Sequence, residues 1–223
     1  MVKISGEGHI PSSYSIVDLI DHIYGKVLRV DPKKPKWAER DYFILSKGHG
    51  CGALYVVLHK YGFLTDQDLA DYSTSQGILG GHPDMTIVPG TEASTGSLGH
   101  GFPTAVGMAL GLRIQKRDNR TFALLGDGEC HEGTIWESAN VAANLGLGNL
   151  CAIVDRNKLI THGSTEEINS LGSMKDKFLS FGWDVCEVDG HDLKKLLKFF
   201  ELFKKNNYNN PIALIANTVK GKG

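Results

Sequence analysis

Apolar runs alternate with segments of helical periodicity along most of the chain. The strongest strand candidates, each with near-continuous hydrophobicity, are 121–126, 150–155, 183–188 and 212–219. Continuous rather than alternating hydrophobicity is typical of parallel strands that are buried on both faces. Because these strands are separated by helical segments, the pattern predicts a parallel sheet with crossover helices.

Helical candidates lie between the strands. In segment 14–30 the apolar residues form one helical face, with Ile16, Leu19, Ile20, Ile23, Val27 and Leu28. Further helices are predicted at 50–61, 103–115, 134–145 and 192–205, the last with Asp192 as a potential N-cap. Segment 78–101 has six glycines, two prolines and few helix or strand signals. A loop of this length in a compact domain is usually functional or mobile.

Composition narrows the class of protein. The chain has 223 residues, 41% hydrophobic and 22% charged, with a formal net charge of −1. These values are typical of a globular protein, and we interpret residues 1–223 as a single domain. They indicate neither nucleic acid nor an anionic membrane as a partner. No apolar run is long enough to span a bilayer and residues 1–13 lack the features of a secretory signal, so we expect a cytoplasmic protein.

The cysteines argue against a disulfide-stabilised protein. Cys51, Cys130, Cys151 and Cys186 form no CxxC pair. So few cysteines in a chain of this length do not suggest a disulfide framework. We expect reduced thiols, some of them buried as small hydrophobic side chains.

The strongest candidate for chemistry is the sequence GDGECHEG at 126–133, which closes the strand 121–126. The next strand is followed closely by Asn157. In open parallel sheets ligands bind at the carboxyl ends of the strands, where helix N-termini favour phosphate. Mg²⁺ prefers oxygen ligands and binds few protein groups beside a phosphate. The predicted metal ligands are therefore Asp127, the Asn157 amide and the carbonyl of Leu159.

A GDG sequence followed by a spaced asparagine resembles the thiamine diphosphate signature. The longer pattern GDGECHEGTIWESAN…LGNLCAIVDRNKLITHGST resembles the transketolase family specifically. A GDG alone would be a weak signal, but further loops match in the family's order over nearly the whole chain. The resemblance implies an α/β, thiamine diphosphate-binding fold with a parallel sheet flanked by helices on both faces.

The resemblance also implies roles for individual residues. His49, in SKGHG, would contact the diphosphate, whereas His82, in GGHPD, and His9, in GEGHIPSS, would face the donor sugar. These three histidines are the predicted catalytic residues. The STGSLGHG loop would pack on the cofactor, and the first lysine of TVKGKG would reach it. The predicted cofactor-binding residues are Ser12, His49, Gly96, Ser97, Leu98, Asp127, Gly128, Glu132, Asn157 and Lys220.

Other motif residues have less definite roles. Glu132 and Glu137 resemble an acidic network at the family's subunit interface, although a solvated helix start would explain them equally simply. His100 and His131 are assigned no catalytic role. Ile10-Pro11-Ser12 replaces a glycine-containing turn and Ser97 replaces a common proline, and both departures bear on the shape of the donor pocket.

The implied activity is transfer of a two-carbon ketol unit from a ketose phosphate to an aldose phosphate. It requires thiamine diphosphate and Mg²⁺, for which Ca²⁺ can substitute. The cofactor carries the chemistry, and the protein supplies orientation and electrostatics. The sequence leaves the donor and acceptor sugars open.

The family needs a second region to work. In transketolases the glutamate that activates the pyrimidine ring belongs to another domain, which nothing in this chain resembles. We therefore expect a partner, a C-terminal transketolase half carrying the pyrimidine-binding domain, in an α₂β₂ assembly. A naturally split enzyme and a truncated chain both explain the missing half.

Two alternatives remain. A 1-deoxyxylulose-5-phosphate synthase-like chain shares the GDG and KGKG features, although EGTIWESAN resembles transketolase more closely. A non-catalytic cofactor-binding module is the other, and the intact Asp127, Asn157, His49 and His82 argue against it.

Overall fold

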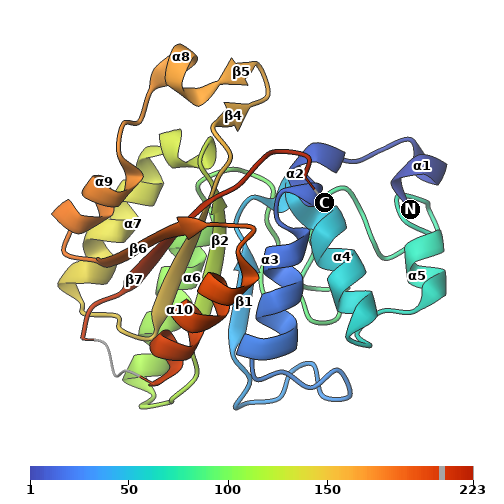
Figure 1. Ribbon diagram of the computed structural model, residues 1–223. Helices are drawn as coiled ribbons and strands as arrows, with labels where there is room; N and C mark the ends of the chain where they lie inside the picture. Colours follow the sequence, from blue (N-terminus) through green and yellow to red (C-terminus); the bar gives the residue numbers. More distant parts are fainter. Residues whose placement is uncertain (206–208, 223) are drawn as a thin grey trace.

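The centre of the molecule is a five-stranded sheet. The computed structural model describes residues 1–205 and 209–222. Its sheet has the strand order β1-β2-β3-β7-β6, and every neighbouring pair is parallel (Figure 1). The strands are β1 Tyr42–Leu45, β2 Thr121–Gly126, β3 Leu150–Arg156, β6 Asp184–Asp189 and β7 Ile212–Asn217.

Helices cover both faces of the sheet, which confirms the predicted α/β architecture. One face packs against α3 Val17–His22, the π-helical turn η1 Ile23–Val27, α4 Cys51–Lys60 and α10 Leu193–Lys205. The other packs against α6 Gly101–Ile114, α7 Gly133–Asn144 and α9 Met174–Ser180. Along β2, Phe122 belongs to the first apolar cluster and Ala123 to the second. Because both faces of the central strands are covered, most of their positions hold apolar residues, as the continuous hydrophobicity indicates.

The remaining elements are short. They are α1 Val2–Ser5, α2 Ile10–Tyr14, η2 Gly48–Gly50, α5 Asp66–Ala70, η3 Glu129–His131, β4 Leu159–Ile160, β5 Gly163–Ser164 and α8 Thr165–Asn169. Strands β4 and β5 form an antiparallel pair. Together with α8 they project beyond the carboxyl end of β3, at the top of Figure 1.

The structure bears out most of the predicted elements and corrects two. Of the predicted helix 14–30, residues 17–27 are helical and end in a π-helical turn, but the helix is interrupted before Val17, since α2 ends at Tyr14. The interruption lies at Ser15, whose hydroxyl donates to Asp155 and to the Ser12 carbonyl. Strand β6 is only half-buried, because it lies at the edge of the sheet. Segment 78–101 has no helix or strand before α6 begins at Gly101.

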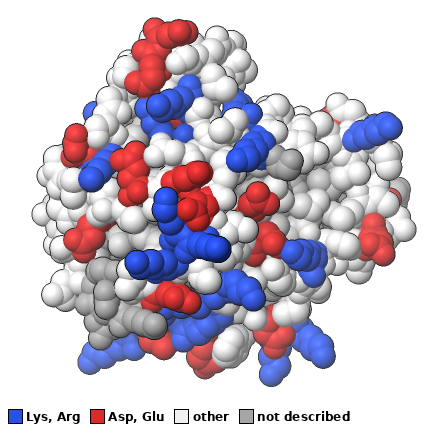
Figure 2. Space-filling view, viewed as in Figure 1, with Lys and Arg blue, Asp and Glu red and all other residues white. Residues whose placement is uncertain are grey.

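Three further observations bear on the class of protein. All four cysteines are free, and only Cys186 is not buried. On the face seen in Figure 2, Lys and Arg side chains are interspersed with Asp and Glu. Within residues 1–205 and 209–222, no helix combines the length and the apolar character needed to cross a membrane.

Candidate functional site

A cavity of about 450 Å³ opens at the carboxyl ends of β2 and β3. Its wall comes from segments that are far apart in the sequence: α2, η2 with the residue before it, the loop before α6, the β2–η3 junction, the β4 turn and the residues after β7. The lining residues are His9, Pro11, Ser12, Lys47, His49, Gly96, Leu98, Gly126, Asp127, Gly128, Glu129, Leu159, Ile160, Thr161 and Lys220.

Most of the predicted site residues meet in this cavity, and four do not line it. His82, Ser97 and Glu132 are exposed beside it, and the Asn157 side chain lies behind its wall. His82 is nevertheless close, because a Cβ atom added to Gly96 would lie 2.8 Å from its Cδ2. Its backbone is held from α4, where the Tyr55 hydroxyl donates to the His82 carbonyl at 2.9 Å.

Asp127 lies directly after β2 and is almost completely buried. Its Oδ1 accepts the Gly128 N–H at 2.8 Å. Its Oδ2 accepts the Lys158 N–H at 2.6 Å and a guanidinium N–H of Arg156 at 3.1 Å. Burial raises the pKa of Asp127, although the Lys158 amide and Arg156 oppose the effect. A carboxylate has about four lone-pair sites, so one acceptor site remains for a cation.

Asn157 and Asp155 form the floor behind the cavity. The Asn157 Nδ2 donates to Asp155 Oδ2 at 2.8 Å, and its Oδ1 accepts the Leu159 N–H at 3.0 Å. Asp155 is fully buried and is paired with Lys47, whose Nζ lies 2.7 Å from Oδ2. Burial alone would raise the pKa of Asp155, but the Lys47 ammonium and the surrounding donors outweigh it and hold this pKa below its ordinary value.

His49 and His9 face each other at the mouth of the cavity. Their rings meet edge to face, with centroids 5.3 Å apart. Burial lowers the pKa of His49 to about 3, and the nearby Lys47 and the histidines His9 and His82 add to the effect. His49 is therefore a neutral imidazole at physiological pH and can either donate or accept a hydrogen bond.

Glu129 closes the inner wall without facing solvent. Its Oε1 accepts from the Ser46 hydroxyl at 2.6 Å and the Gly99 N–H at 3.0 Å, and its Oε2 accepts the Gly126 N–H at 3.2 Å. Burial raises the pKa of Glu129 in spite of these donors. The carboxyl group therefore fixes the loop before α6 against the β2 junction.

Arg156 connects Asp127, the candidate metal ligand, to the projecting segment with β4, β5 and α8. Besides Asp127, its guanidinium donates to the Thr165 hydroxyl at 3.1 Å and to Glu166 at 2.5 Å. Its own side chain is only 7% exposed, whereas that of Glu166 is 41% exposed. One buried cation thus ties α8 to the carboxyl end of β2.

The side chains present fit a hard divalent cation with a diphosphate. Asp127 and Asn157 supply a carboxylate and an amide oxygen, which suit Mg²⁺ or Ca²⁺ rather than a thiol-seeking metal. The backbone at Gly128 is closely covered, since an added Cβ would lie 2.6 Å from Ile160 Cγ2. Among the described residues no group of three or more His, Cys, Asp or Glu side chains is placed to hold a metal. Of the predicted metal ligands, only Asp127 is a side chain of one of these four types.

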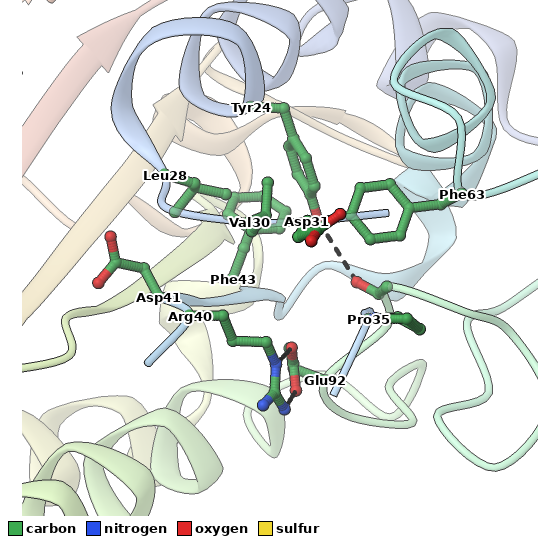
Figure 3. A pocket seen from close by; sticks show the side chains of 11 residues that line it. Tyr24, Leu28, Val30, Asp31, Pro35, Arg40, Asp41, Phe43, Phe63 and Glu92 are labelled. Atoms are coloured by element: carbon green, nitrogen blue, oxygen red, sulfur yellow. Dashed lines mark hydrogen bonds and ion pairs between the residues drawn. The ribbon is translucent and has the colours of Figure 1, made fainter. Parts of the chain in front are cut away.

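A second hollow, at the amino end of β1, differs in size. It holds only about 10 Å³ of space, roughly what one water molecule requires. Figure 3 shows Tyr24, Phe43 and Phe63 among the side chains that line it, with Arg40 and Glu92 paired beside them. A larger hollow of about 440 Å³ adjoins it and shares Pro35, Arg40, Gly90 and Glu92 with its wall. None of the predicted site residues lines either hollow, so the cavity at the carboxyl end is the candidate site.

The sequence motifs did not reveal four charged residues around the cavity: Lys47, Glu129, Asp155 and Arg156. Each of them has at least one partner in a distant segment of the sequence, which no local pattern reveals. One signal was available, because Asp155 and Arg156 end an apolar run whose strand is buried. A buried charge must be paired, so such a position indicates a polar network.

Sequence comparisons with known proteins indicate one family. The family model described as "Transketolase, thiamine diphosphate binding domain" matches residues 1–223. One of the subunits of the apulose-4-phosphate transketolase of Phocaeicola vulgatus is 43% identical over 216 residues, which cover 97% of this chain and 76% of that protein. The 6-deoxy-6-sulfo-D-fructose transketolase subunit SqwG of a Clostridium species is 39% identical over 98% of this chain and 79% of its own length.

Solved structures give the same result. A transketolase mutant of Pichia stipitis superposes with a TM-score of 0.83 at 32% identity over 96% of this chain. This chain spans only 36% of that enzyme. It therefore corresponds to about a third of a full-length transketolase.

Proposed function

Because this chain belongs to the transketolase family through its thiamine diphosphate-binding domain, we propose that it is the diphosphate- and metal-binding subunit of a two-chain transketolase. Residues 1–223 act as one domain in this proposal. The observation that carries it is the placement of Asp127 and His49 in one cavity, with Asn157 directly behind the wall.

The metal would be Mg²⁺, or Ca²⁺ in its place, held by Asp127, Asn157 and the Leu159 carbonyl. Thiamine diphosphate, when bound, supplies a thiazolium carbon that takes up the two-carbon unit of a ketose. His49 and Lys220 would hold the diphosphate, the first as a neutral hydrogen-bonding group and the second as a cation. Ser12, Gly96, Leu98 and Gly128 support the cofactor from the cavity wall.

His9 and His82 would act on the donor sugar. Histidine hydrogen-bonds sugar hydroxyls and moves protons near neutral pH. Both side chains are exposed and lie next to His49 at the mouth of the cavity. His82→Ala should lower kcat much more than it weakens thiamine diphosphate binding. If both fall by the same factor, His82 is a cofactor ligand or a structural residue instead.

The partner would be a chain that carries the pyrimidine-binding domain. Among the described lining residues there is no Phe, Tyr or Trp to hold a pyrimidine ring. A cofactor held at one end only would leave its thiazolium in water, which weakens the chemistry. The relatives named as transketolase subunits support a two-chain enzyme, which we propose to be an α₂β₂ heterotetramer.

The relatives also narrow the substrate. Their names include a 4-phosphate sugar and a 6-sulfo sugar, so we propose a ketose donor with an anionic end group. The acceptor is an aldose phosphate. These names favour ketol transfer over a synthase that uses pyruvate as its donor.

Reconstitution tests the proposal. This chain alone should dimerise or aggregate, bind thiamine diphosphate weakly and give no ketol transfer. Adding the pyrimidine-domain chain should restore turnover with ketose phosphate donors and shift the sedimentation to a heterotetramer. Turnover by this chain alone, equal to that of the mixed chains, would overturn the proposal. Activity with pyruvate but not with ketoses would favour the synthase instead.

A further inference from the structure

Asp155 receives donors from four separate parts of the chain. Its Oδ2 accepts from Lys47 at 2.7 Å, Asn157 at 2.8 Å and Ser15 at 2.9 Å. Its Oδ1 accepts from the Thr218 hydroxyl. The four donors lie after α2, before η2, after β3 and after β7. One carboxylate therefore joins segments that have no sequence proximity.

Each of these segments also supplies a residue of the proposed cofactor site. Ser15 follows α2, which carries Ser12. Lys47 precedes His49, and Thr218 precedes Lys220. Asn157 is itself a proposed metal ligand. A displacement of Asp155 would thus change the positions of all four donors and of the site residues beside them.

The orientation of Asn157 depends directly on Asp155. An ionised carboxylate only accepts hydrogen bonds. The Asn157 amide nitrogen must therefore face Asp155, and its Oδ1 must point away from it. Since Oδ1 is the proposed metal-binding atom, Asp155 selects the amide rotamer that a cation requires.

Lys47 makes this arrangement possible. The Lys47 and Asp155 side chains are 2% and 0% exposed. Without the ammonium, Asp155 would be a buried, uncompensated charge. A buried ion pair is weak evidence for stability, because a well-packed apolar pair often replaces it without loss. Fold stability alone therefore does not explain why Lys47 and Asp155 are buried as an ion pair.

We propose that Lys47 and Asp155 are positioning residues, which orient the Asn157 amide and align the four segments around the cofactor cavity. The inference rests on the proposed function, because it concerns how the cofactor site is held. Neither side chain need touch the reacting atoms. Supporting partners behind a metal site usually change affinity by about 10–100-fold when they are lost.

The test separates positioning from stability. In Lys47→Met the buried carboxylate loses its partner, so the melting midpoint should fall sharply. In the double variant Lys47→Met/Asp155→Leu both charges are gone and leucine keeps the γ-branch of aspartate. Its melting midpoint should recover toward that of the wild type. Ser15 can still donate to the Ser12 carbonyl, 3.0 Å away.

Two measurements on the double variant decide the proposal. Mg²⁺-dependent thiamine diphosphate binding, measured by calorimetry with the pyrimidine-domain chain present, should weaken about 10–100-fold. The second measurement follows the Asn157 side-chain amide protons by NMR in the metal-free chain. These signals are assigned by their loss in Asn157→Ser. They should be protected from exchange in the wild type and exchange freely in the double variant. Unchanged binding with unchanged amide protection would overturn the proposal and leave the pair a structural one.

The matched control is a buried carboxylate of the same sheet that lies far from the cavity. Asp41→Asn should lower the melting midpoint and leave both readouts as in the wild type. Asp127→Ala separates a failure of the proposed function from a failure of the positioning role. If it leaves metal-dependent binding unchanged, the proposed function fails. If only the Lys47/Asp155 variant does so, the positioning role alone fails.

Discussion

The two ends of the parallel sheet each hold a carboxylate away from water and use it differently. At the amino ends, Asp41 accepts the backbone N–H groups of Arg29 at 3.0 Å and Arg120 at 2.8 Å. Its charged partner is the Arg29 side chain, which is 34% exposed. At the carboxyl ends, Asp155 accepts only from side chains, and its charged partner Lys47 is buried.

The difference follows from what each carboxylate joins. Asp41 fixes backbone to backbone, and the hollow beside it is packed down to about 10 Å³. Asp155 fixes side chains around a cavity of about 450 Å³. In our proposal, the same chemical group therefore serves stability at one end and site geometry at the other.

The comparison is tested most strongly at Asp127. Asp127→Ala removes a proposed metal ligand at the carboxyl end, so we expect metal-dependent thiamine diphosphate affinity to fall at least about a hundredfold. The circular dichroism spectrum should stay unchanged, because Arg156 keeps Glu166 as its partner. Calorimetry with and without Mg²⁺ measures the effect. Equal affinities of the variant and the wild type would show that no metal binds at the carboxyl ends of the strands.

The corresponding substitution at the amino ends of the strands is Asp41→Ala. It leaves the Arg29 and Arg120 amides without their acceptor, and we expect the free energy of unfolding to fall by about 2–4 kcal/mol. Cofactor affinity should not change at temperatures where the protein is folded. Urea denaturation and calorimetry measure the two quantities on one sample. A loss of affinity without a loss of stability would contradict the division between the two ends.

Arg156→Met sharpens the comparison within the carboxyl end. The variant cuts α8 free from Asp127, so we expect amide hydrogen exchange in 159–169 to accelerate and metal-dependent affinity to fall about tenfold. Glu166→Gln is the control, because it weakens the outer contact and leaves the pairing with Asp127. It should speed exchange in the same segment with little change in affinity. Similar affinity losses in both variants would assign the effect to the segment rather than to Asp127.

The pH dependence of stability distinguishes His49 from the acidic residues around it. Its pKa of about 3 in the folded chain lies below the ordinary 6.5. The unfolded chain therefore takes up a proton first, and this histidine costs stability as the pH falls from 6.5 toward 3. The raised pKa values of Asp127 and Glu129 act in the opposite direction.

His49→Gln isolates the histidine contribution in the metal-free chain. The variant should lose less stability than the wild type over that acid range, while the two profiles run parallel above it. Urea denaturation across the pH series measures the difference. Parallel profiles over the whole range would mean that His49 is not desolvated in solution.

The smallest expected effect concerns the backbone at Lys158. This residue has a positive φ of 61°, a left-handed conformation that turns its N–H toward Asp127. Lys158→Gly should relieve the strain and raise the free energy of unfolding by about 0.5–1 kcal/mol. Lys158→Ala keeps the strain and should not. Equal stability of both variants would show that the turn is not strained.

Most of the fold could be predicted because its signals are local. Long apolar runs identify β2, β3 and β7, whereas the short β1 is surrounded by polar residues and was missed. The interruption near Ser15 depends on Asp155, which is distant in the sequence. No periodicity within segment 14–30 could reveal it.

The site divides in the same way. Asp127, His49 and Lys220 lie in motifs and line one cavity, and their roles in cofactor binding stay predictions. The pairing of Lys47 with Asp155 links two separate segments and has no sequence signature. Asn157 is a predicted metal ligand, but no sequence motif shows that its amide nitrogen donates to Asp155. Motifs therefore indicate which residues take part, and long-range contacts determine how they are held.

The strand order also has a consequence for how the protein forms. β7 is the last strand of the described chain, yet it lies between β3 and β6. Until it is synthesised, β6 has no neighbour in the sheet and Asp155 lacks the Thr218 donor. A nascent chain that stops short of β7 therefore exposes two unpaired strand edges, which attract other chains. We expect the emerging polypeptide to need chaperone protection until β7 inserts, and the cavity to be among the last features to mature.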